Sequence, residues 1–164
     1  MQLQAKDMLL VDTSGSVEPS AQEVKNMVHK YLRTNKNVLA FASKPYFVKD
    51  EGDLVFGGGT ALSLAFEKVK SMGVDFLIVV TDGMADSPAK AIAMAKKLKN
   101  NGVTICGVYV SKNLEVPEEF TKIADKTFAV NQFNQAVKHC TDIRDDLMGK
   151  EATHKTVDAD KYLF

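Results

Sequence analysis

The sequence carries no net charge, few cysteines and no long apolar run. Lys plus Arg and Asp plus Glu number 21 each among the 164 residues. This balance gives no electrostatic reason to expect nucleic acid or an anionic membrane as the main partner. No stretch approaches the roughly 20 apolar residues that cross a bilayer. Residues 1–7 are polar and Asp12 soon interrupts the apolar run after them, so no signal peptide is evident. We therefore expect a cytoplasmic protein that does not bind membranes.

The scarcity of cysteine restricts both disulfide and metal chemistry. Cys106 and Cys140 are the two cysteines of the chain, and both fall at apolar positions of expected strands or helices. That placement favours two reduced, buried thiols, as in cytosolic proteins, over a disulfide. No CxxC pair occurs, which argues against a metal site built on cysteine.

What is present is the composition of one ordinary globular domain. Hydrophobic residues make up 45% of the chain and charged residues 26%. A chain of this length buries roughly 70% of the surface that it exposes when unfolded, so it can form a core unaided. We expect a single domain over residues 1–148. Residues 149–164 lack hydrophobic periodicity and predict a flexible C-terminal tail, mostly polar until its last three residues.

Short apolar runs typical of strands alternate along the chain with amphipathic stretches typical of helices. The expected strands are Lys6–Val11, Asn37–Ala42, Pro45–Lys49, Val74–Val80, Val103–Val110 and Thr127–Val130. The expected helices are Glu18–Arg33, Thr60–Ser71, Ser87–Asn100, Pro117–Asp125 and Asn131–Met148, with Ser87 as an N-cap, Pro88 in the first turn and Gly102 as a helix-ending residue.

This alternation predicts a three-layer α/β/α, doubly wound fold. The strand at 74–80 has a continuous rather than alternating apolar end, which indicates burial on both faces of a parallel sheet. The strand at 45–49 follows its predecessor too closely for a crossover helix, so we expect it to be antiparallel and at an edge. The prediction is a mostly parallel, six-stranded sheet with the strands at 6–11 and 74–80 central and adjacent.

Three segments with small oxygen-bearing side chains are expected at one end of this sheet. Residues 12–16 (DTSGS) follow the first strand, residues 81–83 (TDG) follow the strand at 74–80, and residues 57–60 (GGGT) precede a helix. In open parallel sheets, ligands bind beyond the carboxyl ends of the strands, where the strand order reverses. Two carboxylates and several hydroxyls can therefore converge there.

This set of side chains suits a hard divalent cation. Mg²⁺ prefers six oxygen ligands in octahedral geometry and usually keeps several waters. The three segments contain no thiol or imidazole, which argues against zinc or copper. We expect Mg²⁺ or Mn²⁺.

The same strings resemble a known family. LLVDTSGSV is similar to the Asp-x-Ser-x-Ser signature of von Willebrand factor A (vWA) domains, whose metal-ion-dependent adhesion site is abbreviated MIDAS. FGGGT resembles the threonine-bearing loop of that family and LIVVTDG its distal aspartate, in the same order, and the resemblance covers about residues 6–148. It implies a Rossmann-like vWA fold. Residue 61, where many members have an acidic or amide side chain, is Ala61 here, so this loop departs from the family's pattern.

The resemblance also implies how the site would work. Ser14, Ser16 and Thr60 would contact the metal, while Asp12 and Asp82 would act mainly through water. The sixth position would be left for water or for an Asp or Glu side chain of a protein partner. Intracellular members of the family often work beside ATPases or in larger complexes, which implies a partner of that kind.

An enzyme of the haloacid-dehalogenase type is the main alternative. Such Mg²⁺-dependent phosphatases also have a doubly wound sheet, with an aspartate nucleophile after the first strand, here Asp12, and a late Asp-Gly motif, here Asp82-Gly83. Their nucleophile motif usually has a second aspartate two residues later, as general acid. This chain has Ser14 there, which cannot act as that acid. No cap-sized insertion is present, so a binding module is favoured over an enzyme.

Other residues near these motifs have simpler interpretations. Asp86 fits a solvated turn residue or a helix cap. No GK[ST] follows the glycine run, which argues against a phosphate-binding P-loop. The three histidines, His29, His139 and His154, lie in no context that suggests a catalytic base. A scaffold with an empty site remains a third alternative.

Overall fold

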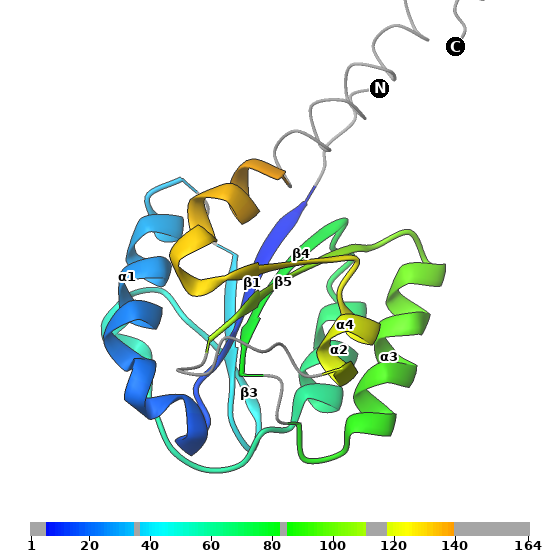
Figure 1. The fold of residues 1–164 in the computed structure, drawn as a ribbon, viewed down its shortest axis with the longest axis horizontal. Helices are drawn as coiled ribbons and strands as arrows, with labels where there is room; N and C mark the ends of the chain where they lie inside the picture. Colours follow the sequence, from blue (N-terminus) through cyan, green and yellow to red (C-terminus); the bar gives the residue numbers. More distant parts are fainter. Residues whose placement is uncertain (1–5, 35–36, 83–84, 111–117, 140–164) are drawn as a thin grey trace, which may run out of the picture.

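The fold is built on one six-stranded sheet. A computed structural model describes residues 6–34, 37–82, 85–110 and 118–139 (Figure 1). The strand order is β3-β2-β1-β4-β5-β6. The strands are β1 (Asp7–Asp12), β2 (Val38–Phe41), β3 (Pro45–Phe47), β4 (Phe76–Thr81), β5 (Thr104–Tyr109) and β6 (Lys126–Ala129).

The pairing of the strands confirms the expected topology. β1 pairs in parallel with β2 on one side and with β4 on the other, and β4-β5 and β5-β6 are also parallel. β3 pairs antiparallel with β2 and lies at an edge. The strand order reverses between β1 and β4, so the carboxyl ends of these two central strands form the switch point at which ligands bind in such sheets.

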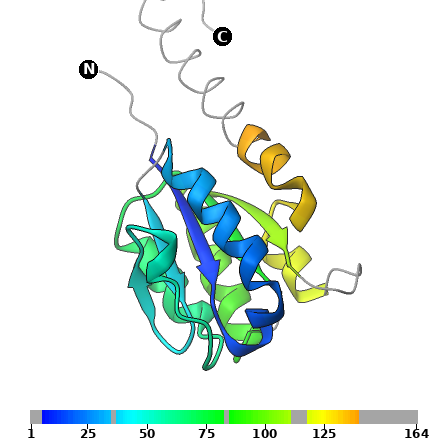
Figure 2. The ribbon, with the colours of Figure 1, turned by 90° about the vertical axis from the view of Figure 1, so that its left-hand side faces the viewer.

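Helices cover both faces of the sheet (Figures 1 and 2). The helices and 3₁₀ turns are η1 (Gly15–Ser20), α1 (Ala21–Leu32), η2 (Glu51–Asp53), α2 (Leu62–Lys70), α3 (Pro88–Asn100), α4 (Glu118–Ile123) and η3 (Val130–Gln132). Residues 133–139, which follow η3, are also helical.

Each face of the sheet has its own apolar core. Met8 and Leu10 of β1 belong to the core under α2, α3 and α4, while Leu9 and Val11 belong to the core under α1 and residues 133–139. Alternate residues of one strand thus point into opposite layers, and all four are 1% exposed or less. β1 is therefore buried on both faces, as befits a central strand of a parallel sheet.

The starts of α1 and α3 differ in detail from the sequence prediction. The helix predicted from Glu18 begins later, at Ala21, after the 3₁₀ turn that contains Pro19. Pro19 has no N–H and disfavours α-helical geometry at Glu18, which is consistent with a 3₁₀ turn there and an α-helix that begins after it. Ser87 stands at the N-cap of α3, but its side chain makes no capping hydrogen bond.

The other end of α3 is closed as the sequence predicts. Gly102 has a φ of 90°, which L side chains rarely adopt, and its N–H donates to the Lys99 carbonyl at 2.9 Å. The Val103 N–H donates to the Leu98 carbonyl at 3.0 Å. These paired bonds are the Schellman arrangement, which satisfies the last carbonyls of the helix and turns the chain towards β5.

Some expectations fall outside the described residues. Cys140, the predicted helix beyond residue 139, His154 and the tail at 149–164 all lie there, so the proposed domain boundary stays a prediction. Cys106 is fully buried, as expected. No helix in the described ranges is both long and apolar enough to cross a membrane.

Candidate metal site

Asp12 is the last residue of β1 and connects the two central strands. Its Oδ1 accepts the N–H of Ser14 at 2.8 Å, and its Oδ2 accepts the hydroxyl of Thr81, at the end of β4, at 2.7 Å. The residue is fully buried. Its carboxylate therefore fixes the turn after β1 against the carboxyl end of β4.

Asp12 is held as a carboxylate at an electrostatic cost. Burial raises its pKa from 3.8 to about 6, hydrogen bonds from Ser14 and Thr81 lower it, and the nearby charge of Asp82 raises it further. Asp82 is itself only 7% exposed. Two like charges in a poorly solvated site repel each other, and a bound cation would relieve this repulsion.

Ser14 and Ser16 bring two hydroxyls to one point. Their Oγ atoms lie 3.1 Å apart. Ser14 is 1% exposed, whereas Ser16 is exposed to solvent. Two oxygens at neighbouring corners of an octahedron with bonds near 2.1 Å are about 3.0 Å apart. The hydroxyl pair therefore already has the spacing of two neighbouring Mg²⁺ ligands.

The glycine-rich segment lies alongside this turn. The Gly57 N–H donates to the Thr13 carbonyl at 2.9 Å, and the Gly15 N–H donates to the Gly58 carbonyl at 3.1 Å. Gly57 and Gly58 have φ angles of 140° and 88°, which residues with a Cβ rarely adopt. The glycines thus allow a close pairing of two turns and lead the chain directly to Thr60.

Thr60 is held in place by a residue whose role the sequence analysis missed. Its N–H donates to Asp86 Oδ2 at 2.9 Å, and its carbonyl accepts the Asp86 N–H at the same distance. The side chain of Thr60 is 5% exposed. Asp86 is exposed, as expected of a turn residue, but it does not cap a helix. Its position in the same loop as Asp82 was the signal available in the sequence.

Two other hydroxyls at this edge, those of Thr13 and Thr81, form hydrogen bonds to other groups of the protein. Thr13 Oγ1 lies 2.7 Å from the hydroxyl of Tyr46 and donates to the Phe41 carbonyl at 3.3 Å. Thr81 donates to Asp12, as described above. Ala61, which departs from the family pattern, donates its N–H to the Ala42 carbonyl at 2.7 Å. The loop is therefore anchored there through its backbone, without an acidic or amide side chain.

The oxygen-bearing residues predicted from the sequence thus lie on connected turns. Hydrogen bonds join Asp12, Ser14 and Ser16, electrostatic repulsion couples Asp12 with Asp82, and the Gly15–Gly58 bond brings up the loop of Thr60. The described residues contain no group of three His, Cys, Asp or Glu side chains that could hold a metal. The donor set predicted from the sequence, neutral hydroxyls with two carboxylates, would suit a hard cation such as Mg²⁺ or Mn²⁺. Their roles as ligands stay predictions.

Comparisons with known proteins reveal similarity in structure only. No protein-family model and no curated protein matches the sequence. The fold is similar to that of proximal thread matrix protein 1 from the mussel byssus, with a TM-score of 0.63 and 20% identity over 87% of this chain and 48% of that one. One structure of that protein has a zinc-occupied MIDAS motif.

A second similar structure is that of manganese-loaded TRAP protein from Plasmodium vivax. Its TM-score is 0.57, with 20% identity over 68% of this chain and 59% of that one. At this level of identity the likeness establishes the fold alone. The aligned part of the chain covers about half the length of the mussel protein and 59% of the length of the parasite protein.

Proposed function

Because this chain has the fold of a von Willebrand factor A domain, we propose that it is a binding module that uses a divalent cation to bind an acidic side chain of a protein partner. The observation that carries this proposal is the pair of hydroxyls of Ser14 and Ser16, 3.1 Å apart beside two buried carboxylates. The zinc-occupied MIDAS of the mussel protein and the manganese-loaded state of the parasite protein support a divalent ion in this fold.

The residues divide into two groups by charge. Ser14, Ser16 and Thr60 would hold the cation directly through neutral oxygens, and Asp12 and Asp82 would act mainly through bridging waters. Both oxygens of Asp12 already accept hydrogen bonds from the protein, which suits a role behind a water rather than as a direct ligand. Mg²⁺ is the first candidate and Mn²⁺ the second.

This division would leave the cation attractive to an outside anion. When bound, the cation supplies a positive centre that three neutral hydroxyls neutralise very little. An Asp or Glu side chain of a partner can complete the coordination. The protein residues supply position: Asp12 fixes the serine turn, and Asp86 fixes the backbone of Thr60. The site would thus select an acidic group through charge and octahedral geometry together.

The partner that we propose is a protein, in a larger complex or beside an ATPase, in the cytoplasm. The balanced charge of the sequence supports neither nucleic acid nor a membrane as the main partner. The phosphatase alternative is disfavoured by Asp12 itself. A nucleophile needs an oxygen directed at the substrate, whereas here Ser14 and Thr81 engage both oxygens of a buried carboxylate.

Partner capture with and without a chelator tests the proposal. Immobilised wild type should retain a partner in Mg²⁺, lose it in EDTA and regain it when Mg²⁺ is restored. Thr60→Ala should lose it under all conditions while remaining folded. Ser71→Ala is a matched control, because it removes an exposed hydroxyl at the opposite end of α2. A partner retained equally by wild type and Thr60→Ala, with and without EDTA, would place binding on another surface.

A turnover assay separates the binding module from the enzyme. A binding module should release no phosphate from a generic phosphomonoester in Mg²⁺. Phosphate release that disappears in Asp12→Asn would favour the phosphatase instead.

A further inference from the structure

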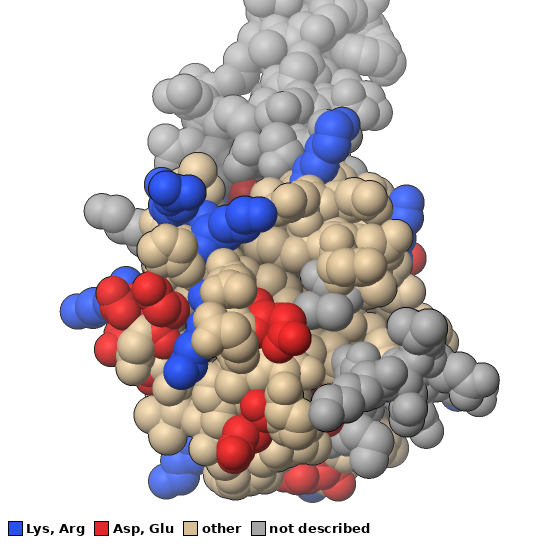
Figure 3. All heavy atoms as spheres, turned by 60° about the vertical axis from the view of Figure 1, so that its left-hand side comes forward, with Lys and Arg blue, Asp and Glu red and all other residues tan. Residues whose placement is uncertain are grey.

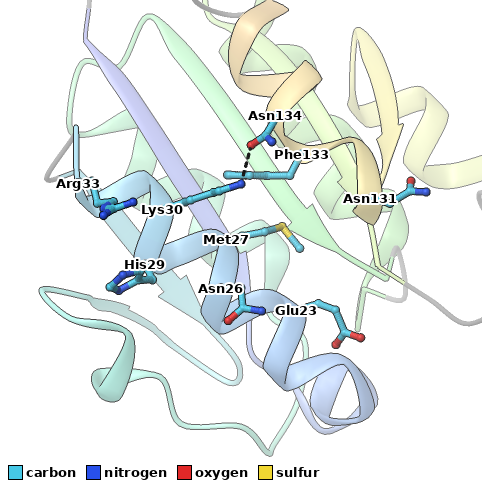
Figure 4. A pocket seen from close by; sticks show the side chains of 9 residues that line it. All are labelled: Glu23, Asn26, Met27, His29, Lys30, Arg33, Asn131, Phe133 and Asn134. Atoms are coloured by element: carbon cyan, nitrogen blue, oxygen red, sulfur yellow. Dashed lines mark hydrogen bonds between the residues drawn. The ribbon is translucent and has the colours of Figure 1, made fainter.

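A groove lies between α1 and the segment that follows β6, and none of its lining residues belongs to the candidate metal site. Figure 4 shows side chains from both segments facing it, and its volume is about 710 Å³. Met27 of α1 and Phe133 form its apolar floor, each about 95% buried. A smaller hollow of about 210 Å³ shares Lys30, Phe133 and Asn134 with it and continues the groove beside Val137.

The rim of the groove is cationic at one end. Lys30 and Arg33 are both exposed, and Lys30 Nζ donates to Asn134 Oδ1 at 3.3 Å. His29 faces Glu51 instead, with its Nδ1 3.1 Å from Oε1. Lys and Arg side chains crowd the upper part of the face that α1 covers, while Asp and Glu lie lower (Figure 3). Glu23, in the first turn of α1, lies at the other end of the groove.

These features define the chemistry of an occupant. Carboxylates would lie against Lys30 and Arg33, with apolar or aromatic side chains next to them over Met27 and Phe133. The amides of the groove, such as that of Asn134, can bind a peptide backbone. An acidic segment with neighbouring aromatic residues meets all of these requirements.

Residues 158–164 of this chain have this composition. The sequence there is Asp-Ala-Asp-Lys-Tyr-Leu-Phe: two carboxylates, one cation and then three large apolar side chains. The rest of the tail has no comparable combination of charge and apolar residues. We propose that residues 158–164 dock in the groove of their own chain, with Asp158 and Asp160 facing Lys30 and Arg33.

The length of the connection permits this docking within one chain. If the last helix ends at Met148, as the sequence predicts, that end lies about 21 Å from Asn134, at 1.5 Å for each residue. Residues 149–157, if extended, span about 30 Å. Residue 158 can therefore reach the groove, and the tether keeps the tail at an effective concentration of the order of millimolar. Weak contacts are then sufficient for docking.

A single tryptophan at the end of the tail tests the proposal. The chain contains no tryptophan, so Phe164→Trp introduces a unique reporter. Acrylamide quenching of its fluorescence should be at least about twofold weaker than that of a free tail peptide, and it should increase at high salt because exposed ion pairs are screened. All measurements are made on the full chain in EDTA, so that the result does not depend on the proposed metal site.

Charge reversal identifies the docking surface. Lys30→Glu with Arg33→Glu should raise quenching to the level of the free peptide, whereas Lys96→Glu with Lys97→Glu, on exposed residues of α3, should leave it unchanged. Asp158→Lys with Asp160→Lys should raise quenching without touching the domain. Combining the reversed tail with the reversed groove should restore protection. Circular dichroism of every variant checks that the fold is retained.

Three outcomes would overturn the proposal. The first is that Phe164→Trp, with Lys30 and Arg33 unchanged, is quenched as strongly as the free tail peptide. Another is protection that survives both charge reversals, which would put the tail elsewhere. The third is protection that depends on protein concentration, with a dimer detected by light scattering, which would mean docking on a second copy rather than in the same chain.

Discussion

Asp86 and Thr60 are joined by two hydrogen bonds in opposite directions: the Asp86 carboxylate accepts the Thr60 N–H, and the Asp86 N–H donates to the Thr60 carbonyl, each at 2.9 Å. Thr60 lies on the glycine-rich loop, and Asp86 follows Asp82 on the loop after β4. The pair therefore links two of the three segments that form the candidate metal site. It fixes the backbone of a residue whose hydroxyl we expect to bind the metal.

Removing the carboxylate of Asp86 should weaken metal binding without abolishing the fold. Asp86→Ala loses the acceptor for the Thr60 N–H, which should lower the free energy of unfolding by about 1 kcal/mol. Mn²⁺ affinity, measured by calorimetry, should fall several-fold because Thr60 is no longer positioned. Asp86→Asn keeps an acceptor oxygen and should retain most of the affinity. Equal losses in both variants would mean that the charge of Asp86 matters rather than its hydrogen bond.

Gly59 should not tolerate a side chain while Asp86 is present. A Cβ at this position would lie 2.8 Å from Asp86 Oδ2, closer than real Cβ contacts. Gly59→Ala should therefore displace the carboxylate, break its bond to Thr60 and cost about 1–2 kcal/mol of stability. Combined with Asp86→Ala, the same substitution should cost much less, because the clashing atom is gone. Thermal unfolding of the two single variants and the double variant measures this coupling, and additive losses would contradict it.

The stability of the metal-free protein should fall as pH rises from about 4 to about 6. Burial raises the pKa of Asp12 to about 6 in the folded state, from 3.8, so the folded chain holds a proton there that the unfolded chain has already lost. The bound proton stabilises the folded state fully below the unfolded-state pKa of 3.8, and this stabilisation is lost as the pH rises past the folded-state pKa of about 6. For this group alone it amounts to about 3 kcal/mol.

Urea unfolding in EDTA across this pH range measures the effect. Asp12→Asn removes the titrating group and should remove this contribution to the pH dependence. It should also make the metal-free protein more stable than wild type at neutral pH. Mn²⁺ affinity of the wild type should rise over the same range, because the carboxylate must be deprotonated to assist binding. If the free energy of unfolding of Asp12→Asn depends on pH as steeply as that of the wild type, another group causes the pH dependence.

Deleting residues 150–164 should change the melting temperature by no more than about 2 °C. The tail is expected to be flexible. Its proposed docking uses exposed charge pairs, which contribute little each, and an apolar floor that is already about 95% buried without the tail. Differential scanning calorimetry of the full and shortened chains checks this. A loss of 5 °C or more would show that the tail packs as part of the domain rather than docking reversibly on it.

The fold could be predicted because its two central strands consist almost entirely of apolar residues. Residues 8–11 and 76–80 are all apolar, which indicates strands that are buried on both faces of a parallel sheet. The close spacing of residues 42 and 45 leaves room only for a turn and an antiparallel edge strand. The start of α1 was misplaced by three residues. An amphipathic pattern continues through Pro19, but residues Gly15–Ser20 form a 3₁₀ turn rather than part of the α-helix.

The candidate site was partly predictable for a similar reason. The sequence predicts site residues because each lies beside an expected strand end or helix start, and their role as metal ligands stays a prediction: Asp12, Ser14, Ser16, Thr60 and Asp82. The role of Asp86 depends on its approach to Thr60 through space, which no local pattern specifies. The groove between α1 and residues 131–134 also escaped prediction, because it arises where segments about 100 residues apart in sequence meet.

The measurement that tests the central claim most directly is Mn²⁺ binding to the purified protein, by calorimetry, for wild type and for Ser14→Ala with Ser16→Ala. We predict one site in the wild type and an affinity at least about tenfold lower in the double variant, since even the loss of outer-shell partners costs about 10–100-fold. Ser71→Ala, which removes a hydroxyl remote from the site, should bind like the wild type. Equal binding by wild type and the double serine variant would contradict the assignment of this edge of the sheet as the metal site.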